Sequence, residues 1–244
     1  FMLASSLCYI FWRNALVARS PSWHFLLLLI LFFLLALFSK ENAIVLLPVL
    51  VLMEVLWFQG ANASGKVHRG LRRASHGLLA VGTVAAVGLL IYGTDWIVAG
   101  FTIRDFSLSD RLLTESRILW DYVGQLYMPE HVRMGLFHDD VIISRTLMQP
   151  ISTLYAVAAW AALGCAILAL WFARIAWAAV FTVLWFLVGH SIESTVLALE
   201  LYFEHRNYFP GIGLFLLPIV TAGLLCKRYT QVVSPLLVLG CFYV

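Results

Sequence analysis

The chain has 244 residues, of which 62% are hydrophobic and only 12% are charged, and its formal net charge is +3. Soluble domains contain roughly 45–50% apolar and about 25% charged residues, so the composition excludes an ordinary soluble domain. Most of the chain falls into apolar blocks of about 20 residues, the length that a helix needs to cross a bilayer. We therefore predict an all-α, polytopic transmembrane protein.

The apolar blocks predict six complete membrane spans and a partial span at each end. Because these blocks take up most of the chain, we expect residues 1–244 to form one transmembrane helix bundle. Both ends lie inside apolar runs, so we expect the sequence to be a piece of a longer protein. The predicted spans are residues 1–12 (partial), 23–39, 43–59, 77–98, 151–172, 175–190, 208–226 and 232–244 (partial).

The charges divide between the two sides of the predicted membrane. One set of loops carries basic residues and no acid, which marks that side as cytoplasmic. These loops are residues 13–22, 60–76, 173–174 and 227–231. The opposite side carries every acidic residue except Glu54. We therefore place the acidic residues and the long outer loop, residues 100–149, on the extracytoplasmic side.

Charged residues also stand at or within the second complete span. Lys40 and Glu41 occupy the short loop "SKEN" that precedes it. Charges between consecutive membrane helices favour a functional role, because burying them costs free energy unless they are paired or hydrated. A surface loop that carries a Lys-Glu pair without cost is the alternative. Glu54 is interpreted either as snorkelling toward the cytoplasmic headgroups or as part of a proton relay.

The stretch "GANASGKV", residues 60–67, has the glycine and lysine spacing of a phosphate-binding loop. Val67 stands where such a loop needs Ser or Thr for magnesium, and a membrane helix replaces the required strand. We interpret the stretch instead as a basic cytoplasmic loop that touches anionic lipid headgroups.

The long outer loop contains one predicted helix. Ser107 and Asp110 form a capping-box start, and Pro129 stops the helix. Its apolar side has Leu112, Leu119, Val123 and Leu126, and its polar side has Asp110, Thr114, Arg117, Asp121 and Gln125. Such a helix can lie along the membrane surface, half in headgroups and half in water, or it can cap the bundle.

His138, Asp139 and Asp140 follow this helix and contain the ligand types of a hard-cation or acid/base cluster. Three consecutive residues do not all converge on one point from regular structure. A solvated turn in which the aspartates cap backbone donors is therefore favoured, and no firm metal site is predicted.

The stretch "ELYFEHRNYFPGIG" places charge at the mouth of the last complete span. On a helix that ends before Pro210, Glu193, Glu200 and Glu204 would share one face, and the last two would repel each other. Arg206 can fold back to pair with these carboxylates. Alternatively, its planar guanidinium can bind a phosphate at headgroup depth.

Three stretches resemble a known family in the same order along the chain. They are "FLLALFSKENAIVLLPVLVLMEVL", "RDFSLSDRLLTESRILWDYVGQLYMPEHVRMGLFHDD" and "ELYFEHRNYFPGIGLFL". Similar segments occur in the polytopic membrane proteins that carry tetratricopeptide repeats after their membrane part. Those proteins belong with the GT-C glycosyltransferases, and their animal members resemble protein O-mannosyltransferases. The resemblance covers nearly the whole chain and is of bacterial type.

The resemblance implies a transferase that moves a sugar from a polyprenyl-phosphate carrier to a protein or glycan acceptor on the extracytoplasmic face. It implies a bacterial inner membrane with the active side toward the periplasm, with the ER membrane as the alternative. In that superfamily an acidic residue or pair in the first outward loop acts as base or metal ligand, and that loop would lie upstream of Phe1. The catalytic residue is therefore unassigned, and the activity of this fragment and its use of a divalent cation stay open. The expected partners are membrane lipid, the lipid-linked sugar donor and the acceptor, with no nucleic acid.

Within this reading, we expect Lys40 and Arg206 to contact the carrier phosphate, with His205 in support. Tyr208 can alternatively be an aromatic-belt anchor at the membrane interface. The residues expected at the rim or on the sugar are Glu41, His138, Asp139, Asp140, Glu204 and Tyr208.

Two alternatives remain open. A lipid-linked O-antigen polymerase or ligase would need several outward arginines that converge. A transporter or a noncatalytic membrane scaffold belongs to a different class, and transporters typically show mid-membrane ionisable residues and internal repeats.

Overall fold

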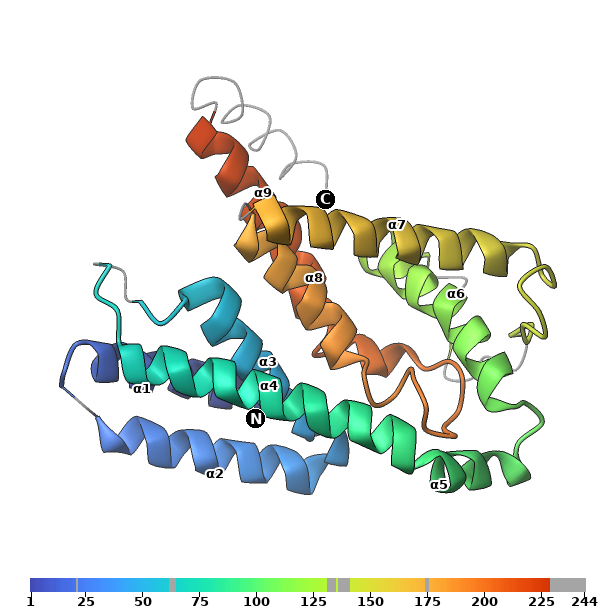
Figure 1. Ribbon diagram of the computed structural model, residues 1–244, viewed down its shortest axis with the longest axis horizontal. Coiled ribbons are helices and arrows are strands. Elements are labelled where there is room, and N and C mark those ends of the chain that lie inside the picture. Colours follow the sequence, from blue (N-terminus) through green and yellow to red (C-terminus); the bar gives the residue numbers. More distant parts are fainter. Residues whose placement is uncertain (21, 62–64, 131–134, 136–140, 174–175, 229–244) are drawn as a thin grey trace.

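The computed structural model describes residues 1–20, 22–61, 65–130, 135, 141–173 and 176–228 (Figure 1). Every regular element among these residues is helical, which confirms the predicted all-α class, and extended backbone pairs only at two isolated bridges. The α-helices are α1 (Met2–Val17), α2 (Trp23–Ser39), α3 (Leu46–Leu52), α4 (Arg69–Tyr92), α5 (Thr94–Ala99), α6 (Leu108–Tyr127), α7 (Ser152–Ala173), α8 (Trp177–Gly189) and α9 (Gly211–Arg228). The shorter 3-10 or π segments are η1 (Glu41–Val45), η2 (Met53–Phe58), η3 (Gly100–Ile103) and η5 (Glu204–Asn207).

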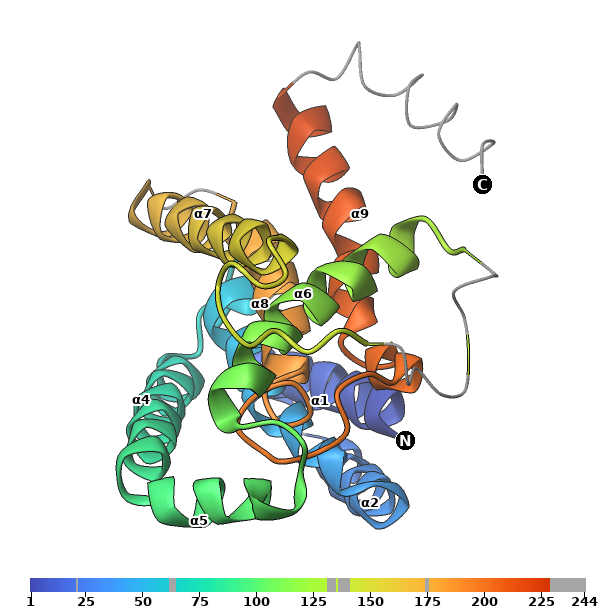
Figure 2. The same cartoon turned by 90° about the vertical axis from the view of Figure 1, so that its right-hand side faces the viewer.

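The helices pack in neighbouring pairs around α3 and α8. Helix α1 packs against α2, and α3 packs against α4 and α8. Helix α6 packs against α7 and α9, and α8 against α9. Figure 1 shows α8 crossing between a lower group of helices and α7, and Figure 2 shows α9 projecting away from the rest.

Three helical stretches in the described residues are long and apolar enough to cross a membrane: Glu41–Phe58, Arg69–Tyr92 and Ser152–Ala173. They match three of the six predicted complete spans. Helices α2, α8 and α9 are apolar but shorter. The 13 residues of α8 extend about 20 Å at 1.5 Å per residue, which is less than the roughly 30 Å of a bilayer core.

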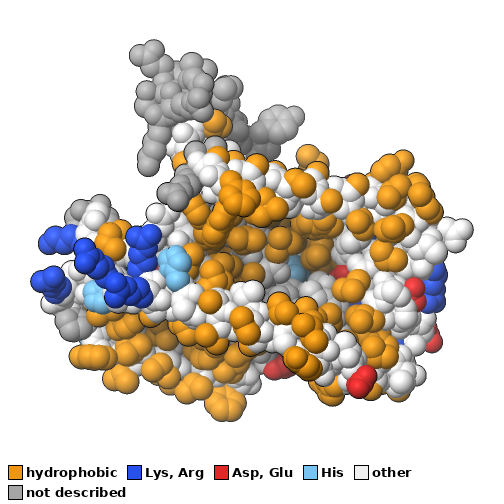
Figure 3. All heavy atoms as spheres, viewed as in Figure 1, with side chains coloured by type: hydrophobic (Ala, Val, Ile, Leu, Met, Phe, Trp, Pro, Cys, Tyr) orange, Lys and Arg blue, Asp and Glu red, His pale blue; other side chains and the backbone are white. Residues whose placement is uncertain are grey.

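Helices α4 and α7 expose apolar side chains over most of their length. Only 6% of the most apolar stretch of α4, and the same share of α7, is buried within the protein. Figure 3 shows apolar side chains along both helices, and it shows Lys and Arg gathered over the start of α4. We call this the basic end of the molecule. Acidic side chains in the same view lie away from it.

The first core joins α1 to α3, η2 and α8, and it contains a buried ion pair. Arg13 Nε lies 2.8 Å from Glu54 Oε2, and the two side chains are 0% and 1% exposed. The Tyr9 hydroxyl donates to the same carboxylate oxygen at 2.8 Å. Two predictions are thereby wrong: Arg13 belongs to a helix and not to a loop, and Glu54 does not snorkel. A buried partner satisfies Glu54 more completely than distant headgroups could.

Helix α6 begins at the predicted residue, but its polar side faces the protein interior. Ser107 Oγ accepts from the Asp110 backbone N–H at 3.2 Å, and Asp110 accepts from the Ser107 N–H at 3.0 Å, so the capping box is confirmed. The helix packs on α7 and α9, as in the capping alternative. However, Arg111 and Glu115 are buried, while Leu112 is 44% exposed. The polar side therefore faces protein, because partners for its charges lie there.

The connection between α8 and α9 is made of turns and the short η5 segment, so the helix expected to align Glu193, Glu200 and Glu204 is not formed. Instead of an intrahelical ladder, two arginines bind the carbonyl groups of this connection. Arg111 donates to Glu193 O, Thr195 O and Leu199 O. These bonds replace the donors that a helix would have supplied.

Candidate functional site

A pocket of about 200 Å³ lies where α2 ends and where the α8–α9 connection returns. Its polar lining comes from two segments that are far apart in the sequence. Lys40 and Asn42 stand at the end of α2 and in η1, and the other side comes from the α8–α9 connection. The polar residues that line it are Ser39, Lys40, Asn42, Glu193, His205, Arg206 and Tyr208.

The pocket unites the three residues expected to contact phosphate. Lys40 leaves α2 in an extended conformation (φ −161°, ψ 128°), which ends the helix and turns the chain into η1. His205 and Arg206 lie in η5, a short turn that precedes α9. Since Pro210 cannot donate a backbone hydrogen bond, this turn cannot run uninterrupted into the interior of a helix. Lys40, His205 and Arg206 thus line one cavity.

Glu193 completes the pocket, and the sequence analysis did not single it out as a site residue. Lys40 Nζ lies 2.6 Å from Glu193 Oε1, and the Glu193 side chain is only 7% exposed. Among the described residues, Glu193 Oε2 and Asn42 Oδ1 are buried oxygens without a hydrogen-bond partner. Burying an acceptor without a donor costs about 1–3 kcal/mol. Two residues that line the pocket therefore each carry an acceptor oxygen that lacks a donor.

Arg206 is oriented by the backbone and not by carboxylates. Its Nη1 donates to Glu200 O at 2.7 Å and to Leu201 O at 3.2 Å, and its guanidinium carbon stands 5.1 Å from the centre of the Phe203 ring. The expected pairing of Arg206 with the Glu200 carboxylate is wrong, because Arg104 Nη1 binds Glu200 Oε1 at 2.5 Å. The same Nη1 lies 3.4 Å from Glu193 O, so three carbonyl groups of the connection hold the guanidinium at the pocket.

His205 contributes hydrogen bonding more than charge. Burial, followed by the nearby cations Lys40 and Arg206, lowers the pKa of His205 below its ordinary value of 6.5. Its imidazole is therefore neutral at neutral pH and presents one donor and one acceptor. Tyr208 is 68% exposed at the edge of the pocket, so the interface-anchor alternative stays open.

Among the described residues, the predicted rim residues Glu41 and Glu204 do not line the pocket. Glu41 is exposed at the start of η1. Glu204 accepts a hydrogen bond from the Gly135 backbone N–H at 3.3 Å, which ties the outer loop to the α8–α9 connection. His138, Asp139 and Asp140 lie outside the described residues. Among the residues that are described, no group of three or more His, Cys, Asp or Glu side chains is arranged to hold a metal ion.

A buried polar cluster lies behind the pocket. Glu115 Oε1 is 3.1 Å from Arg111 Nη2, but neither Glu115 oxygen receives a hydrogen bond of good geometry. Burial raises the pKa of Glu115 to about 7, against the opposing effect of Arg111. His190 Nε2 contacts Asn207 Oδ1 at 3.1 Å, and both side chains are buried.

Only part of this cluster could be recognised in the sequence. Arg111 and Glu115 have the i, i+4 spacing of an ion pair, but the same spacing is common on exposed helix faces. His190 and Asn207 are 17 residues apart and meet only because the α8–α9 connection folds back.

Comparisons of the chain with protein-family models, with curated proteins and with solved structures found no match. The fold and the site define the class as an all-α protein, and in its described part three helices are able, by length and composition, to cross a membrane. Its distinctive feature is one small pocket in which cationic and acceptor groups meet apolar side chains.

Proposed function

We propose that the pocket beside Lys40 and Arg206 binds the phosphate of a polyprenyl-phosphate sugar, and that the protein is a GT-C-type glycosyltransferase of a polytopic membrane bundle. The observation that carries the proposal is the pocket's composition. Lys40 and Arg206 can bind a phosphate, and Glu193 and Asn42, which line the same cavity, each carry a buried oxygen without a donor. A lipid-linked sugar brings both an anion and hydroxyl donors.

The apolar part of the pocket supports a prenyl chain as the third component of this ligand. The side chains on this part come from the start of α1, from α2, from η1 and from the residue before Pro210. They are Phe1, Met2, Ala36, Ala43 and Phe209. An isoprenoid chain can leave the pocket along α2, whose outer side chains Leu27 and Leu31 are 67% and 50% exposed. Its burial against hydrocarbon is favourable by about 25 cal/mol per Å².

The chemistry assigns each polar group a role. Lys40 provides a point charge and Arg206 a planar fork, and both stabilise the phosphate that departs when the sugar is transferred. Binding phosphate requires Lys40 to loosen its 2.6 Å contact with Glu193, which then becomes available to a sugar hydroxyl. The base that activates the acceptor hydroxyl is proposed to come from an outward loop upstream of Phe1 in a longer chain.

The proposed orientation places the basic end in the cytoplasm and this pocket at the opposite face. Positive residues near the ends of membrane helices favour this orientation. In a bacterial cell the pocket would then open toward the periplasm, where the protein or glycan acceptor is reached.

A noncatalytic lipid-binding scaffold is the competing function for this pocket, and the experiment separates the two. Binding of the lipid-linked sugar without transfer by the full-length protein would support the scaffold. A lipid-linked O-antigen ligase is less favoured, since among the described residues Arg206 is the one arginine that lines the pocket.

The test measures binding of a labelled polyprenyl-phosphate sugar to the protein in nanodiscs, together with binding of the matching polyprenyl alcohol. Lys40→Gln and Arg206→Gln should each weaken phosphate-ligand binding roughly tenfold or more, because each removes a charged hydrogen bond. Arg145→Gln is the matched control, since Arg145 pairs with Asp110 outside the pocket and is 54% exposed. Equal binding of phosphate and alcohol by all variants would show that the pocket recognises only the hydrocarbon.

A further inference from the structure

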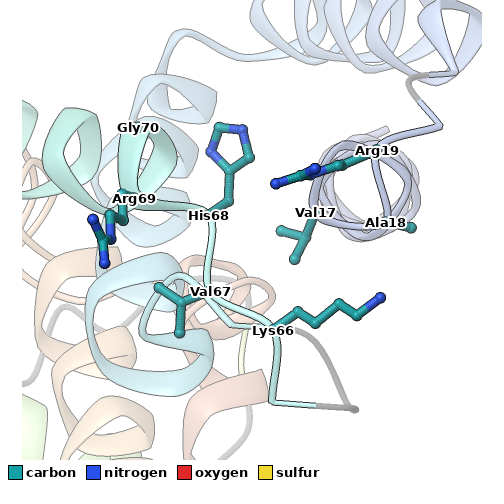
Figure 4. A pocket seen from close by; sticks show the side chains of 8 residues that line it. All are labelled: Val17, Ala18, Arg19, Lys66, Val67, His68, Arg69 and Gly70. Atoms are coloured by element: carbon teal, nitrogen blue, oxygen red, sulfur yellow. The ribbon is translucent and has the colours of Figure 1, made fainter.

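A second cavity lies at the basic end, between the end of α1 and the start of α4, and its volume is about 790 Å³ (Figure 4). The cations Arg19, Lys66 and Arg69 line it together with His68, and none of its described lining residues is acidic. This volume is within the roughly 300–1,000 Å³ of typical ligand sites. The cavity is separate from the Lys40 pocket, which lies at the start of α1 and the end of α2.

The end of α1 directs Arg19 into this cavity. The Ser20 N–H donates to Ala15 O at 3.0 Å and the Arg19 N–H to Leu16 O at 3.1 Å, which is the Schellman arrangement. Arg19 therefore adopts φ 61°, the left-handed conformation in which glycine is most favourable. Figure 4 shows its guanidinium directed toward the imidazole of His68 across the opening.

The start of α4 supplies neutral hydrogen-bond donors. His68 caps the helix, and its Nδ1 accepts from the Leu71 N–H at 3.0 Å. A neutral His68 therefore carries its proton on Nε2, which leaves a donor on the other side of the ring. Arg69 and Gly70 are the first residues of α4, and the first N–H groups of a helix have no carbonyl partner within it. Helix N-termini favour anions for this reason.

Apolar surface continues from the cavity along α4. Leu78 and Val81, two to three turns into the helix, are 61% and 68% exposed. A soluble anion has no apolar part that could contact this surface, whereas the acyl chains of a lipid would cover it. The cavity thus presents cations and donors at the start of α4, a helix of membrane length whose next turns expose hydrocarbon.

We propose that this cavity binds the phosphate group of an anionic lipid from the leaflet at the basic end of the protein. Arg19 and Lys66 contact the phosphate, His68 Nε2 and the first N–H groups of α4 donate to it, and the acyl chains lie along α4. This site is independent of the sugar-carrier pocket. It is a defined binding site for one lipid, whereas the sequence predicted only a basic loop that touches anionic headgroups.

The test uses the full chain in nanodiscs of phosphatidylcholine with a minor fraction of phosphatidylglycerol, and native mass spectrometry counts the phosphatidylglycerol retained by the released protein. Lys66→Gln and Arg19→Gly should each reduce occupancy about fivefold, as expected for removal of one cation near a lipid surface. Glycine suits the left-handed position of residue 19, so Arg19→Gly should keep or raise the melting temperature. This variant separates lipid binding from folding.

Arg73→Gln is the matched control, because Arg73 is exposed on the same first turns of α4 but does not line the cavity. It should leave occupancy within about twofold of the unchanged protein. Equal losses in all three variants would overturn the proposal in favour of diffuse attraction between charges. In a second arm, detergent-solubilised protein is titrated with inorganic phosphate. Tight phosphate binding that Arg19→Gly abolishes, without any preference for phosphatidylglycerol, would identify a free anion as the ligand.

Discussion

Arg13 of α1 and Glu54 of η2, which are 41 residues apart in sequence, form a two-pronged ion pair inside the helical core. Arg13 Nε and Nη2 donate to the two carboxylate oxygens at 2.8 and 3.2 Å, and Nη2 also donates to Ala61 O at 2.6 Å. The Arg13 guanidinium stands 3.9 Å from the centre of the Phe58 ring. Every edge of this buried cation is occupied, so the pair fixes α1 against η2 and the following turn.

Removal of one partner should therefore be costly. Glu54→Leu leaves Arg13 charged and without its carboxylate in the core, and the expected loss of unfolding free energy is about 3–5 kcal/mol. The double variant Arg13→Met/Glu54→Leu should recover much of that loss, because it removes both charges. Thermal unfolding in detergent measures both. If the double variant is as unstable as the single variant, the loss of stability does not come from the unpaired charge of Arg13 but from the contacts that the pair itself makes.

Glu115 should make stability depend on pH. Its folded-state pKa of about 7 exceeds the ordinary 4.5, so between these values the folded chain holds a proton that the unfolded chain has released. The resulting stabilisation is complete below about pH 4.5 and is lost as the pH rises to about 7. The full change is about 3 kcal/mol.

Glu115→Gln should remove this dependence, because its amide stays neutral throughout. Melting temperatures of both proteins, measured between about pH 5 and pH 8, should show the unchanged protein losing stability relative to the variant as the pH rises. A constant difference between the two curves would mean that Glu115 is ionised in the folded state over the whole range.

Gly189 marks the closest approach between the end of α8 and Pro210. A Cβ added at Gly189 would lie 2.7 Å from Pro210 Cγ and 3.0 Å from its Cα. Gly189→Ala should therefore destabilise the fold by about 1–3 kcal/mol through overpacking. Gly124→Ala in α6 is the control, since a Cβ there meets nothing within 4 Å. It should gain up to about 1 kcal/mol from helix propensity.

Arg111 should hold the α8–α9 connection in place. A lysine at this position keeps the charge but cannot reach the carbonyl groups of Glu193, Thr195 and Leu199 with one ammonium group. Arg111→Lys is therefore expected to lower the melting temperature and to speed proteolysis between residues 190 and 207. Arg104→Lys should have a smaller effect, because the Arg104 side chain is 25% exposed. Equal protection of the connection in all three proteins would contradict this assignment.

Local chemistry made part of this structure predictable. Ser107 and Asp110 form reciprocal hydrogen bonds across the first turn of α6, so four consecutive residues were enough to predict where that helix starts. Lys40 and Arg206 both stand at the mouths of apolar segments, and a shared side of the membrane was enough to expect them near one another.

Long-range partners were not predictable, because one sequence does not indicate which segments touch. Arg13 was assigned to a loop for its charge alone, since its partner Glu54 is remote in the chain. For the same reason the sequence could not decide whether α6 lies along the membrane surface, with its polar side in water, or caps the bundle. Arg111 instead finds its acceptors in the α8–α9 connection, whose own irregular backbone depends on that arginine.

The hydrogen bonds of Arg111 also impose an order on biogenesis. Its acceptors come 82 to 89 residues later in the chain, so they have not been synthesised when α6 leaves the ribosome. Until residue 200 has been synthesised, α6 has to remain at the membrane interface or bound to the insertion machinery. The protein is therefore expected to reach its final arrangement only after α8 has been inserted, with α6 docking as a late step.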